Sequence, residues 1–329
     1  MADAAETSRQ YWTLGPGRGA LRTEPVPRPA EGQALIRTRF SAVSPGTESL
    51  VHRGDVPESV HQLMRAPFQL GDLPHPVSHG YLQVGDVVEG PAALIGRTVF
   101  TLAGHRDHVV VPAEDCHQVP DGMPARRALL AGPAETALNA LWEGGVMLGD
   151  RVVVVGGGLI GLTAALLAVR SGPSRLTLVE PDSARRDLAS SLGLEVTAPG
   201  EAEGDADVVL HSSATEEGLS EALRLVGDDG TLVEQSWYGR RTPEVPLGAD
   251  FHARRLRIVA SQVGAVAQSR RLRRTPRQRL AGALALLDER FDRLLSPAVP
   301  LTDLPTLLDR IAEGSAPSTM ICPVIDHSL

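Results

Sequence analysis

The chain has 329 residues, of which 42% are hydrophobic and 22% are charged, as is typical of a globular protein. Its formal net charge of −8 argues against nucleic acid or an anionic membrane surface as a partner. All 32 basic residues are arginines, so lysine-based Schiff-base or proton-transfer chemistry is excluded.

The cysteines and the apolar runs bear on the cellular compartment. Cys116 and Cys322 fit no metal-ligand spacing and indicate a reducing compartment. The first residues are polar and acidic and contain no apolar signal core. The longest apolar run, residues 159–169, is too short to span a bilayer. We therefore expect a cytoplasmic protein without a membrane partner.

Short strands broken by glycine and proline dominate the first 130 residues. Such strands are predicted at residues 33–43, 81–90, 97–104 and 107–113. This pattern of short strands predicts an all-β domain with a barrel-like form.

From about residue 134 the pattern changes to strands that alternate with amphipathic helices. Strands are predicted at residues 151–155, 175–179, 206–210, 230–237 and 256–261, and helices at 159–170, 183–192 and 217–225. This alternation predicts an α/β unit with a doubly wound parallel sheet. An arginine-rich stretch (269–279), helices at 278–287 and 304–312, and a strand at 318–325 are predicted to follow.

A glycine motif lies where the first of these strands meets its helix. Gly156, Gly158 and Gly161 are spaced as G-x-G-x-x-G, with Leu159 and Ile160 between the last two. Such glycines allow a tight turn, a close approach of a pyrophosphate to the backbone, and close packing of helix on strand. The helix N-terminus adds free N–H groups and a positive potential. The motif predicts a dinucleotide site.

The next strand ends at Glu180, nineteen residues after Gly161. A carboxylate there hydrogen-bonds the adenosine ribose and repels a 2′-phosphate, so NAD(H) is preferred over NADP(H). Arg185 and Arg186 could reach a phosphate, which leaves NADP open. His211 ends the fourth strand, where ligands bind outside the carboxyl ends of such strands; it is predicted to lie near the nicotinamide half or to be structural.

The whole chain resembles the medium-chain dehydrogenase/reductase superfamily, which includes the zinc-type alcohol dehydrogenases. The resemblance rests on residues 149–161 (GDRVVVVGGGLIG), on PAETALNAL (133–141) as a linking segment, and on the β-rich first domain. It implies a GroES-like catalytic domain (1–133 and 267–329), a Rossmann domain (134–266) and a homodimer or homotetramer. The stretches SPGTE, HGY, SWYG and FHARRLRI are similar to a zinc-lacking branch related to bacteriochlorophyllide dehydrogenases.

The positions that hold catalytic zinc in this superfamily carry no metal ligands here. Pro45 stands in place of the cysteine ligand and Tyr81 in place of the histidine ligand, and the third ligand position falls at about Gly132. Zinc requires three protein ligands of the N, S or O type, so we expect no bound metal.

The resemblance gives catalytic roles to three residues around that vacated position. Thr47 matches the hydroxyl that relays the alcohol proton, and Glu48 matches the carboxylate that orients the histidine ligand. Tyr81 is expected to project its phenol into the metal space and to hold or donate the proton on the substrate oxygen. The alternative is that Tyr81 merely fills the volume.

Other candidate residues have structural alternatives of equal or greater weight. His105 or His108 could act as an acid–base group or lie in a surface loop. Trp237 and Tyr238 could wall the substrate pocket or pack in the core. The arginines of residues 269–279 could bind an anionic substrate, although a solvated face is the commoner outcome.

These observations predict a zinc-independent oxidoreductase that moves hydride between NAD(H) and an alcohol or ketone of a small organic substrate. The alternatives are NADPH-dependent reduction of an activated carbon–carbon double bond and a non-catalytic nucleotide-binding protein. The catalytic set is Tyr81, Glu48, Thr47 and His105, and the cofactor set adds Arg185 and His211 to the glycine turn and Glu180.

Overall fold

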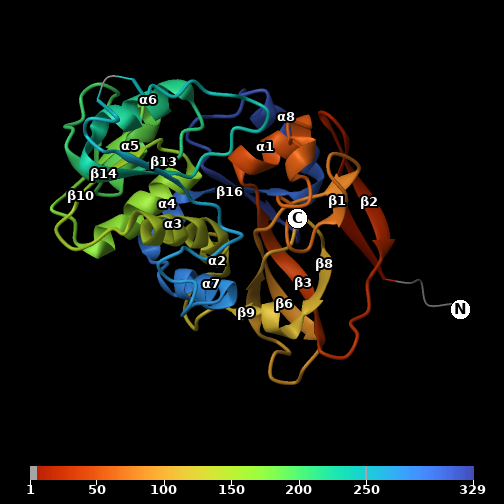
Figure 1. The fold of residues 1–329 in the computed structure, drawn as a ribbon. Helices are drawn as coiled ribbons and strands as arrows, with labels where there is room; N and C mark the ends of the chain where they lie inside the picture. Colours follow the sequence, from red (N-terminus) through yellow and green to blue (C-terminus); the bar gives the residue numbers. More distant parts are fainter. Residues whose placement is uncertain (1–5, 249) are drawn as a thin grey trace, which may run out of the picture. The chain divides into compact units, whose positions relative to one another are not determined.

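The computed structural model describes residues 6–248 and 250–329 (Figure 1). It divides into two compact units. Unit 1 comprises the chain up to Gly132 together with Leu294–Leu329, and unit 2 comprises Pro133–Arg293.

The second division differs from the one expected from the sequence. Residues 267–293, which we assigned to the first domain, pack with unit 2. The reason is the helix α7 (Pro276–Ala285), whose residue Arg279 is buried and bonded to Glu135 and Asn139 of unit 2. The first division, at Gly132, lies within one residue of the expected boundary.

Unit 1 is rich in strands, as the sequence predicts. One sheet has the order β2-β1-β5-β4, and a larger one has the order β16-β17-β3-β6-β7-β9, with β8 also paired to β3. Neighbouring strands are antiparallel except for the parallel pair β16 and β17. The strands are β1 (Thr7–Gly15), β2 (Arg18–Pro25), β3 (Gln33–Ala42), β4 (Leu70–Gly71), β5 (Val77–Ser78), β6 (Gln83–Glu89), β7 (Thr98–Thr101), β8 (His108–Pro112), β9 (His117–Gln118), β16 (Leu295–Pro300) and β17 (Cys322–Asp326).

A helix that the sequence analysis did not identify lies between β3 and β4. Helix α1 (Pro45–Arg53) starts with proline at its first position and has Glu48 in its first turn, where a negative charge is favourable. It ends at Gly54, which adopts the left-handed conformation with φ 76°. Helix α1 packs against α8 (Leu304–Ala312), beside which it lies in Figure 1. The described part of unit 1 also contains the short helix α2 (Ala125–Ala128).

Unit 2 contains a parallel sheet of six strands in the order β12-β11-β10-β13-β14-β15. The strands are β10 (Arg151–Val155), β11 (Arg175–Val179), β12 (Glu195–Thr197), β13 (Ala206–His211), β14 (Val226–Glu234) and β15 (Arg257–Ala260). The chain moves outward from β10 to β12 and then returns to the other side of β10. This order is that of a Rossmann sheet, with its switch point between β10 and β13.

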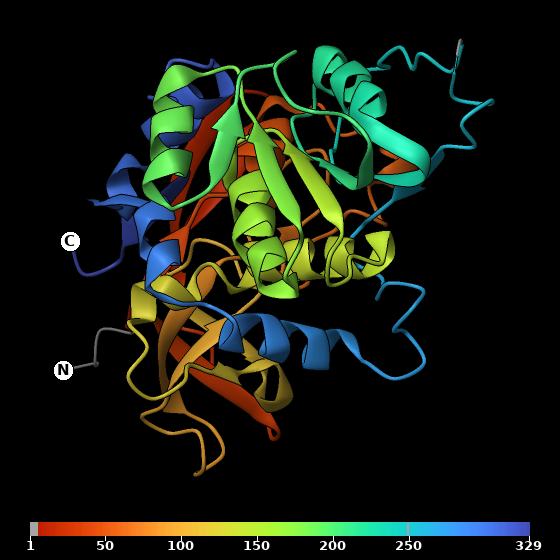
Figure 2. The ribbon, with the colours of Figure 1, turned by 90° about the vertical axis from the view of Figure 1, so that its left-hand side faces the viewer.

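Helices pack on the strands of this sheet, as the view in Figure 2 shows. Because crossovers between parallel strands are right-handed, α4 and α5 cover one face and α6 covers the other. The helices of the unit are α3 (Ala131–Gly144, whose first two residues belong to unit 1), α4 (Leu159–Ala168), α5 (Ser183–Ser191), α6 (Glu216–Leu225) and α7. Short 3-10 helices lie at Glu58–Val60, Ala113–Asp115, Val169–Ser171, Glu289–Leu294 and Leu301–Asp303.

Each unit has its own apolar interior. The sheet of unit 2 buries the valines of β10 together with residues of α6, β13 and β14. Unit 1 has one cluster between β3, β7 and β8 and another where α8 meets β1 and β17. The predicted fold class, a doubly wound α/β unit with a β-rich partner, is confirmed.

Candidate active site

The Tyr81 phenol lies in a small cluster of hydroxyl groups in unit 1. It is hydrogen-bonded to the side chains of Ser44, which precedes α1, and of Thr47, in the first turn of α1. Burial raises the pKa of Tyr81 to about 12; the two hydroxyl partners oppose this rise and nearby Glu48 adds to it. The phenol is therefore protonated at neutral pH and is a potential proton donor.

The three residues that the resemblance assigns to zinc-ligand positions, Pro45, Tyr81 and Gly132, lie in or beside this cluster. Pro45 is the first residue of α1, adjacent to Ser44. A Cβ built at Gly132 would lie 2.5 Å from Leu82 Cδ2 and 3.7 Å from Tyr81 Cδ2, so Gly132 leaves room for the neighbouring side chains. Across residues 6–248 and 250–329, no group of three or more His, Cys, Asp or Glu side chains is arranged to hold a metal ion.

Glu48 does not contact Tyr81 directly but holds His105. The Glu48 carboxylate accepts the Ser44 backbone N–H at 2.8 Å through Oε1, and its Oε2 lies 2.8 Å from His105 Nε2. Both side chains are buried. The predicted catalytic residues Tyr81, Thr47, Glu48 and His105 therefore fall in one region of unit 1, with Ser44 linking them.

A further histidine next to Tyr81 was missed by the sequence analysis. The ring of His79 meets the Tyr81 ring edge to face, with centroids 6.0 Å apart. Burial lowers the pKa of His79 to about 4, so this imidazole is neutral at neutral pH. Its Nδ1 is buried and has no hydrogen-bond partner among the residues that the structure describes. The only sequence signal was its place in the HGY stretch that led to Tyr81.

The glycine turn of unit 2 is open at the position where a pyrophosphate would approach. A Cβ built at Gly158 meets no atom of the described residues within 4 Å, and Gly158 is the N-cap residue of α4. Gly156 has φ 108°, and a Cβ there would lie 2.8 Å from Ser213 N. At Gly161 a Cβ would lie 1.7 Å from Gly156 O. The surroundings of the three glycines are compatible with the three predicted tasks, and Leu159 and Ile160 form the first turn of the helix.

Glu180 lies at the carboxyl end of β11, as predicted. Its Oε2 accepts the Gly157 N–H at 2.6 Å and its Oε1 accepts the Asp182 N–H at 2.9 Å. Arg186 donates to the carbonyl oxygens of Glu180 and Pro181 at 2.9 and 2.6 Å. Arg185 stands in the first turn of α5, where its backbone N–H is capped by Asp182. These residues fit the adenosine end of a dinucleotide.

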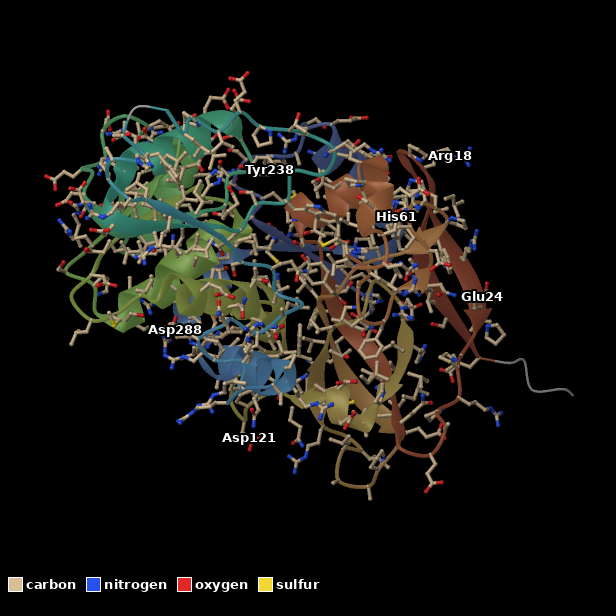
Figure 3. The ribbon with its side chains drawn as sticks, in the orientation of Figure 1. Arg18, Glu24, His61, Asp121, Tyr238 and Asp288 are labelled. Atoms are coloured by element: carbon tan, nitrogen blue, oxygen red, sulfur yellow. The ribbon has the colours of Figure 1, made fainter. Side chains whose placement is uncertain are left out.

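His211 ends β13 as predicted, but its ring is fully buried. Its Nδ1 lies 2.8 Å from Glu234 Oε2 and its Nε2 lies 2.7 Å from Ser213 Oγ. Tyr238, labelled in Figure 3, donates its phenol to Glu234 at 3.2 Å. Burial alone would raise the pKa of the Glu234 carboxyl, but bonds from His211 and Ser236 outweigh it and hold that pKa below its usual value. Both ring nitrogens of His211 are therefore occupied, and its contacts link the carboxyl ends of β13 and β14.

The remaining candidate residues differ in their burial and in their hydrogen-bond partners. His108 begins β8 and is partly buried, and within residues 6–248 and 250–329 its Nδ1 has no hydrogen-bond partner. Trp237 is partly exposed after β14. Residues 269–278 are exposed, as expected of a solvated face, but Arg279 is buried and paired with Glu135 at 3.0 Å. Among the described residues no helix is both long enough and apolar enough to cross a membrane.

Comparison with known proteins gives relatives of one kind. No protein-family model matches the chain. Over 260 residues the chain is 28% identical to a D-guloside 3-dehydrogenase of Shigella flexneri, covering 70% of this chain and 74% of the relative.

Solved structures agree with the fold over nearly the full length. A putative zinc-binding dehydrogenase from Sinorhizobium meliloti 1021, bound to NADP, has a TM-score of 0.76 at 19% identity and covers 98% of this chain and 99% of its own. A protein from Escherichia coli CFT073 described as a short chain alcohol dehydrogenase, complexed with NADH, has a TM-score of 0.77 at 14% identity, with 97% and 99% covered.

The fold, the glycine turn and these similarities define the class. The chain is similar in sequence and in fold to proteins of the medium-chain dehydrogenase/reductase superfamily, of the zinc-type alcohol dehydrogenase-like kind. It is an NAD(P)-dependent dehydrogenase of that superfamily.

Proposed function

We propose that this protein is a zinc-independent dehydrogenase that transfers hydride between NAD(H) and an alcohol or ketone group of a small organic substrate. The observation that carries the proposal is the hydroxyl cluster of Tyr81, Ser44 and Thr47, which lies beside the residues that the resemblance assigns to the superfamily's metal-ligand positions. The zinc-lacking branch that the sequence resembles fits the same proposal.

The side chains at the metal position support a mechanism without zinc. Proline and glycine offer no donor atom, and the Tyr81 phenol is protonated at neutral pH. A zinc ligand must be deprotonated, which is unfavourable for a phenol of such weak acidity. The side chains at these positions therefore do not fit a catalytic zinc ion.

Tyr81 can perform the task that a Lewis acid performs elsewhere. During reduction of a ketone, negative charge develops on the substrate oxygen and must be stabilised. The phenol donates its proton to that oxygen, while Thr47 and Ser44 stabilise the phenolate by hydrogen bonds. The nicotinamide, when bound, supplies the hydride or accepts it.

Glu180 supports NAD(H) as the cofactor. Its buried carboxylate is oriented by two backbone N–H groups, and it is positioned to accept the ribose hydroxyls and to repel a 2′-phosphate. Arg186, one of the two nearby arginines that could hold such a phosphate, is engaged with two carbonyl oxygens. The similarity to a D-guloside 3-dehydrogenase supports an alcohol or polyol substrate. The homodimer or homotetramer and the cytoplasmic location remain predictions.

The test is the variant Tyr81→Phe, assayed with a panel of secondary alcohols, ketones and enones. Positioned acid–base groups contribute about 10²–10⁴-fold, so the turnover number should fall by that range. Cofactor affinity should hardly change, because the glycine turn is untouched. Tyr11→Phe is the matched control, since it removes another buried phenol of unit 1, one bonded to His52 at 3.1 Å. Tyr11→Phe should keep most of the turnover.

Three results would contradict the proposal in different ways. Near-normal turnover in Tyr81→Phe would reduce Tyr81 to a residue that fills space. Stoichiometric zinc, required for activity and removed by chelator, would exclude the metal-free mechanism. Turnover of enones with NADPH, but of no alcohol or ketone, would favour the double-bond reductase.

A further inference from the structure

The loop that follows β13 lies directly against the glycine turn of unit 2. This loop consists of residues 212–215, and we call it the β13 loop. The Ser212 hydroxyl donates to Gly156 O at 3.4 Å. A Cβ built at Gly161 would lie 2.7 Å from Ser212 Oγ, and one built at Gly156 would lie 2.8 Å from Ser213 N. The shape of the turn is therefore coupled to the position of the β13 loop.

Side-chain hydrogen bonds from a buried histidine hold the β13 loop. His211 Nε2 lies 2.7 Å from Ser213 Oγ, and this oxygen accepts the Thr215 backbone N–H at 3.2 Å. Thr215 Oγ1 in turn caps α6 by accepting the Gly218 N–H at 3.0 Å. A line of bonds thus runs from the end of β13 through the loop to the first turn of α6.

The other ring nitrogen of His211 is anchored on the neighbouring strand. Nδ1 lies 2.8 Å from Glu234 Oε2, and the second carboxylate oxygen of Glu234 accepts the Ser236 N–H at 2.7 Å. The Ser236 hydroxyl accepts the backbone N–H of Ala214 at 3.1 Å. Ala214 has φ 53°, a left-handed conformation that is unfavourable for alanine and persists only with such support. The β13 loop is therefore held from both β13 and β14.

The first turn of α6 leaves space for this arrangement. A Cβ built at Gly218 would overlap Ser213 Oγ and would lie 3.1 Å from His211 Nε2. Glycine favours a helix less than alanine does, so helix stability alone does not account for glycine at this position. The missing side chain at Gly218 gives Ser213 the room to reach His211.

We propose that His211 and Ser213 are positioning residues of the cofactor site, which hold the β13 loop in the shape that lets the glycine turn accept the dinucleotide pyrophosphate. The inference rests on the proposed cofactor role of the glycine turn and does not depend on the role of Tyr81. Both nitrogens of His211 are occupied by protein groups, so this residue acts through the loop and not by contact with the cofactor. Loss of the link should weaken NADH binding while the sheet stays folded.

Gly218→Ala is the most selective perturbation, because it removes no polar group. The added methyl would overlap the Ser213 hydroxyl, which can rotate away about one single bond and so lose its contact with His211. We expect the variant to fold, as urea unfolding would verify. The dissociation constant for NADH, measured by fluorescence titration, should rise about tenfold, the order expected for one link of a buried network.

Ser213→Ala removes the same link by deleting the hydroxyl. It should raise the dissociation constant for NADH by a similar factor. Because both substitutions break one contact, a variant that carries Ser213→Ala and Gly218→Ala together should lose no more affinity than either single variant. Losses that multiply in the double variant would show that the two residues act separately, and would overturn the shared link.

Two amide substitutions at His211 separate its two contacts. Glutamine places its amide near the former Nε2 and can keep the bond to Ser213, whereas asparagine places its amide near the former Nδ1 and can keep only the bond to Glu234. We therefore expect His211→Gln to bind NADH more tightly than His211→Asn. Equal losses in the two variants would show that the volume of the ring matters and not its bond to Ser213, which would overturn the inference.

Two substitutions serve as matched controls. Gly282→Ala adds a methyl inside α7, where a built Cβ meets no atom of the described residues within 4 Å. His52→Asn changes another buried histidine with both nitrogens bonded, to Tyr11 at 3.1 Å and to Asp309 at 2.8 Å, and these three residues belong to unit 1. Both controls should keep the native dissociation constant for NADH.

The outcomes separate this inference from the proposed function. Folded Gly218→Ala and Ser213→Ala variants with native NADH affinity would overturn the inference and leave the cofactor site in place. An unmodified protein that does not bind NADH would refute the proposed cofactor site, and the inference with it.

Discussion

Gly158→Ala tests the dinucleotide site most directly, because the structure separates its effect on binding from its effect on folding. The backbone of Gly158 has φ −81° and ψ −171°, an extended conformation that alanine adopts freely. The added methyl group would meet no protein atom within 4 Å. We therefore expect the variant to fold with native stability, or to gain about 0.4–1 kcal/mol from the reduced freedom of the unfolded chain.

The same methyl group would occupy the space that a pyrophosphate needs. Overpacking of one methyl typically costs about 1–3 kcal/mol, which corresponds to an increase of about 5- to 150-fold in the dissociation constant for NADH. Fluorescence titration with NADH measures this change, and urea unfolding of the same samples measures stability.

Two other glycines provide the controls. Gly282→Ala adds a methyl in α7, also with no atom within 4 Å, and should leave NADH affinity unchanged. Gly161→Ala would bring a Cβ to 1.7 Å from Gly156 O and should destabilise the fold as well as binding. Unchanged NADH affinity in a folded Gly158→Ala variant would refute the reasoning, because the dinucleotide would then lie elsewhere.

Three further predictions concern charged groups. Glu180→Ala should raise the Michaelis constant for NADH by the equivalent of about 1.5–3 kcal/mol, which is the range for hydrogen bonds to a charged group. Equal or better use of NADPH by the unmodified protein would contradict the role of Glu180 in cofactor choice. Arg279→Met should lower the free energy of unfolding in urea by about 3–5 kcal/mol, because Glu135 stays buried without its partner. Adding Glu135→Gln should recover part of this loss. No recovery in the double variant would argue against the ion pair as the cause. Because the pKa of Asp107 is depressed in the folded chain, its contribution to stability is present above about pH 4 and lost as the pH falls further. Asp107→Asn should therefore flatten the acid limb of a stability profile measured by urea unfolding, and a native acid limb in that variant would show that Asp107 contributes nothing there.

The sequence by itself determined the parts of this protein whose signals are local. The strand at residues 151–155, the glycines after it and Glu180 at the end of the next strand lie within thirty residues and read directly as a dinucleotide site. The predicted helix at residues 304–312 agrees with α8 to the residue, because its apolar positions recur at helical spacing. The resemblance to the superfamily assigned Tyr81, Thr47 and Glu48 to one site without any knowledge of the structure.

Tertiary structure alone decided what depends on distant residues. Ser41 and His327 are 286 positions apart and meet only because β17 pairs with β3, so no local pattern marks this contact. The position of His211 at the carboxyl end of a parallel strand is typical of a cofactor-binding residue, yet Glu234 and Ser213 occupy both of its ring nitrogens. Arg279 looked like one of six solvated arginines until the packing of α7 buried it against Glu135. Periodicity and motif report what a residue's neighbours in sequence require, whereas charge pairing and burial depend on what the fold brings into contact.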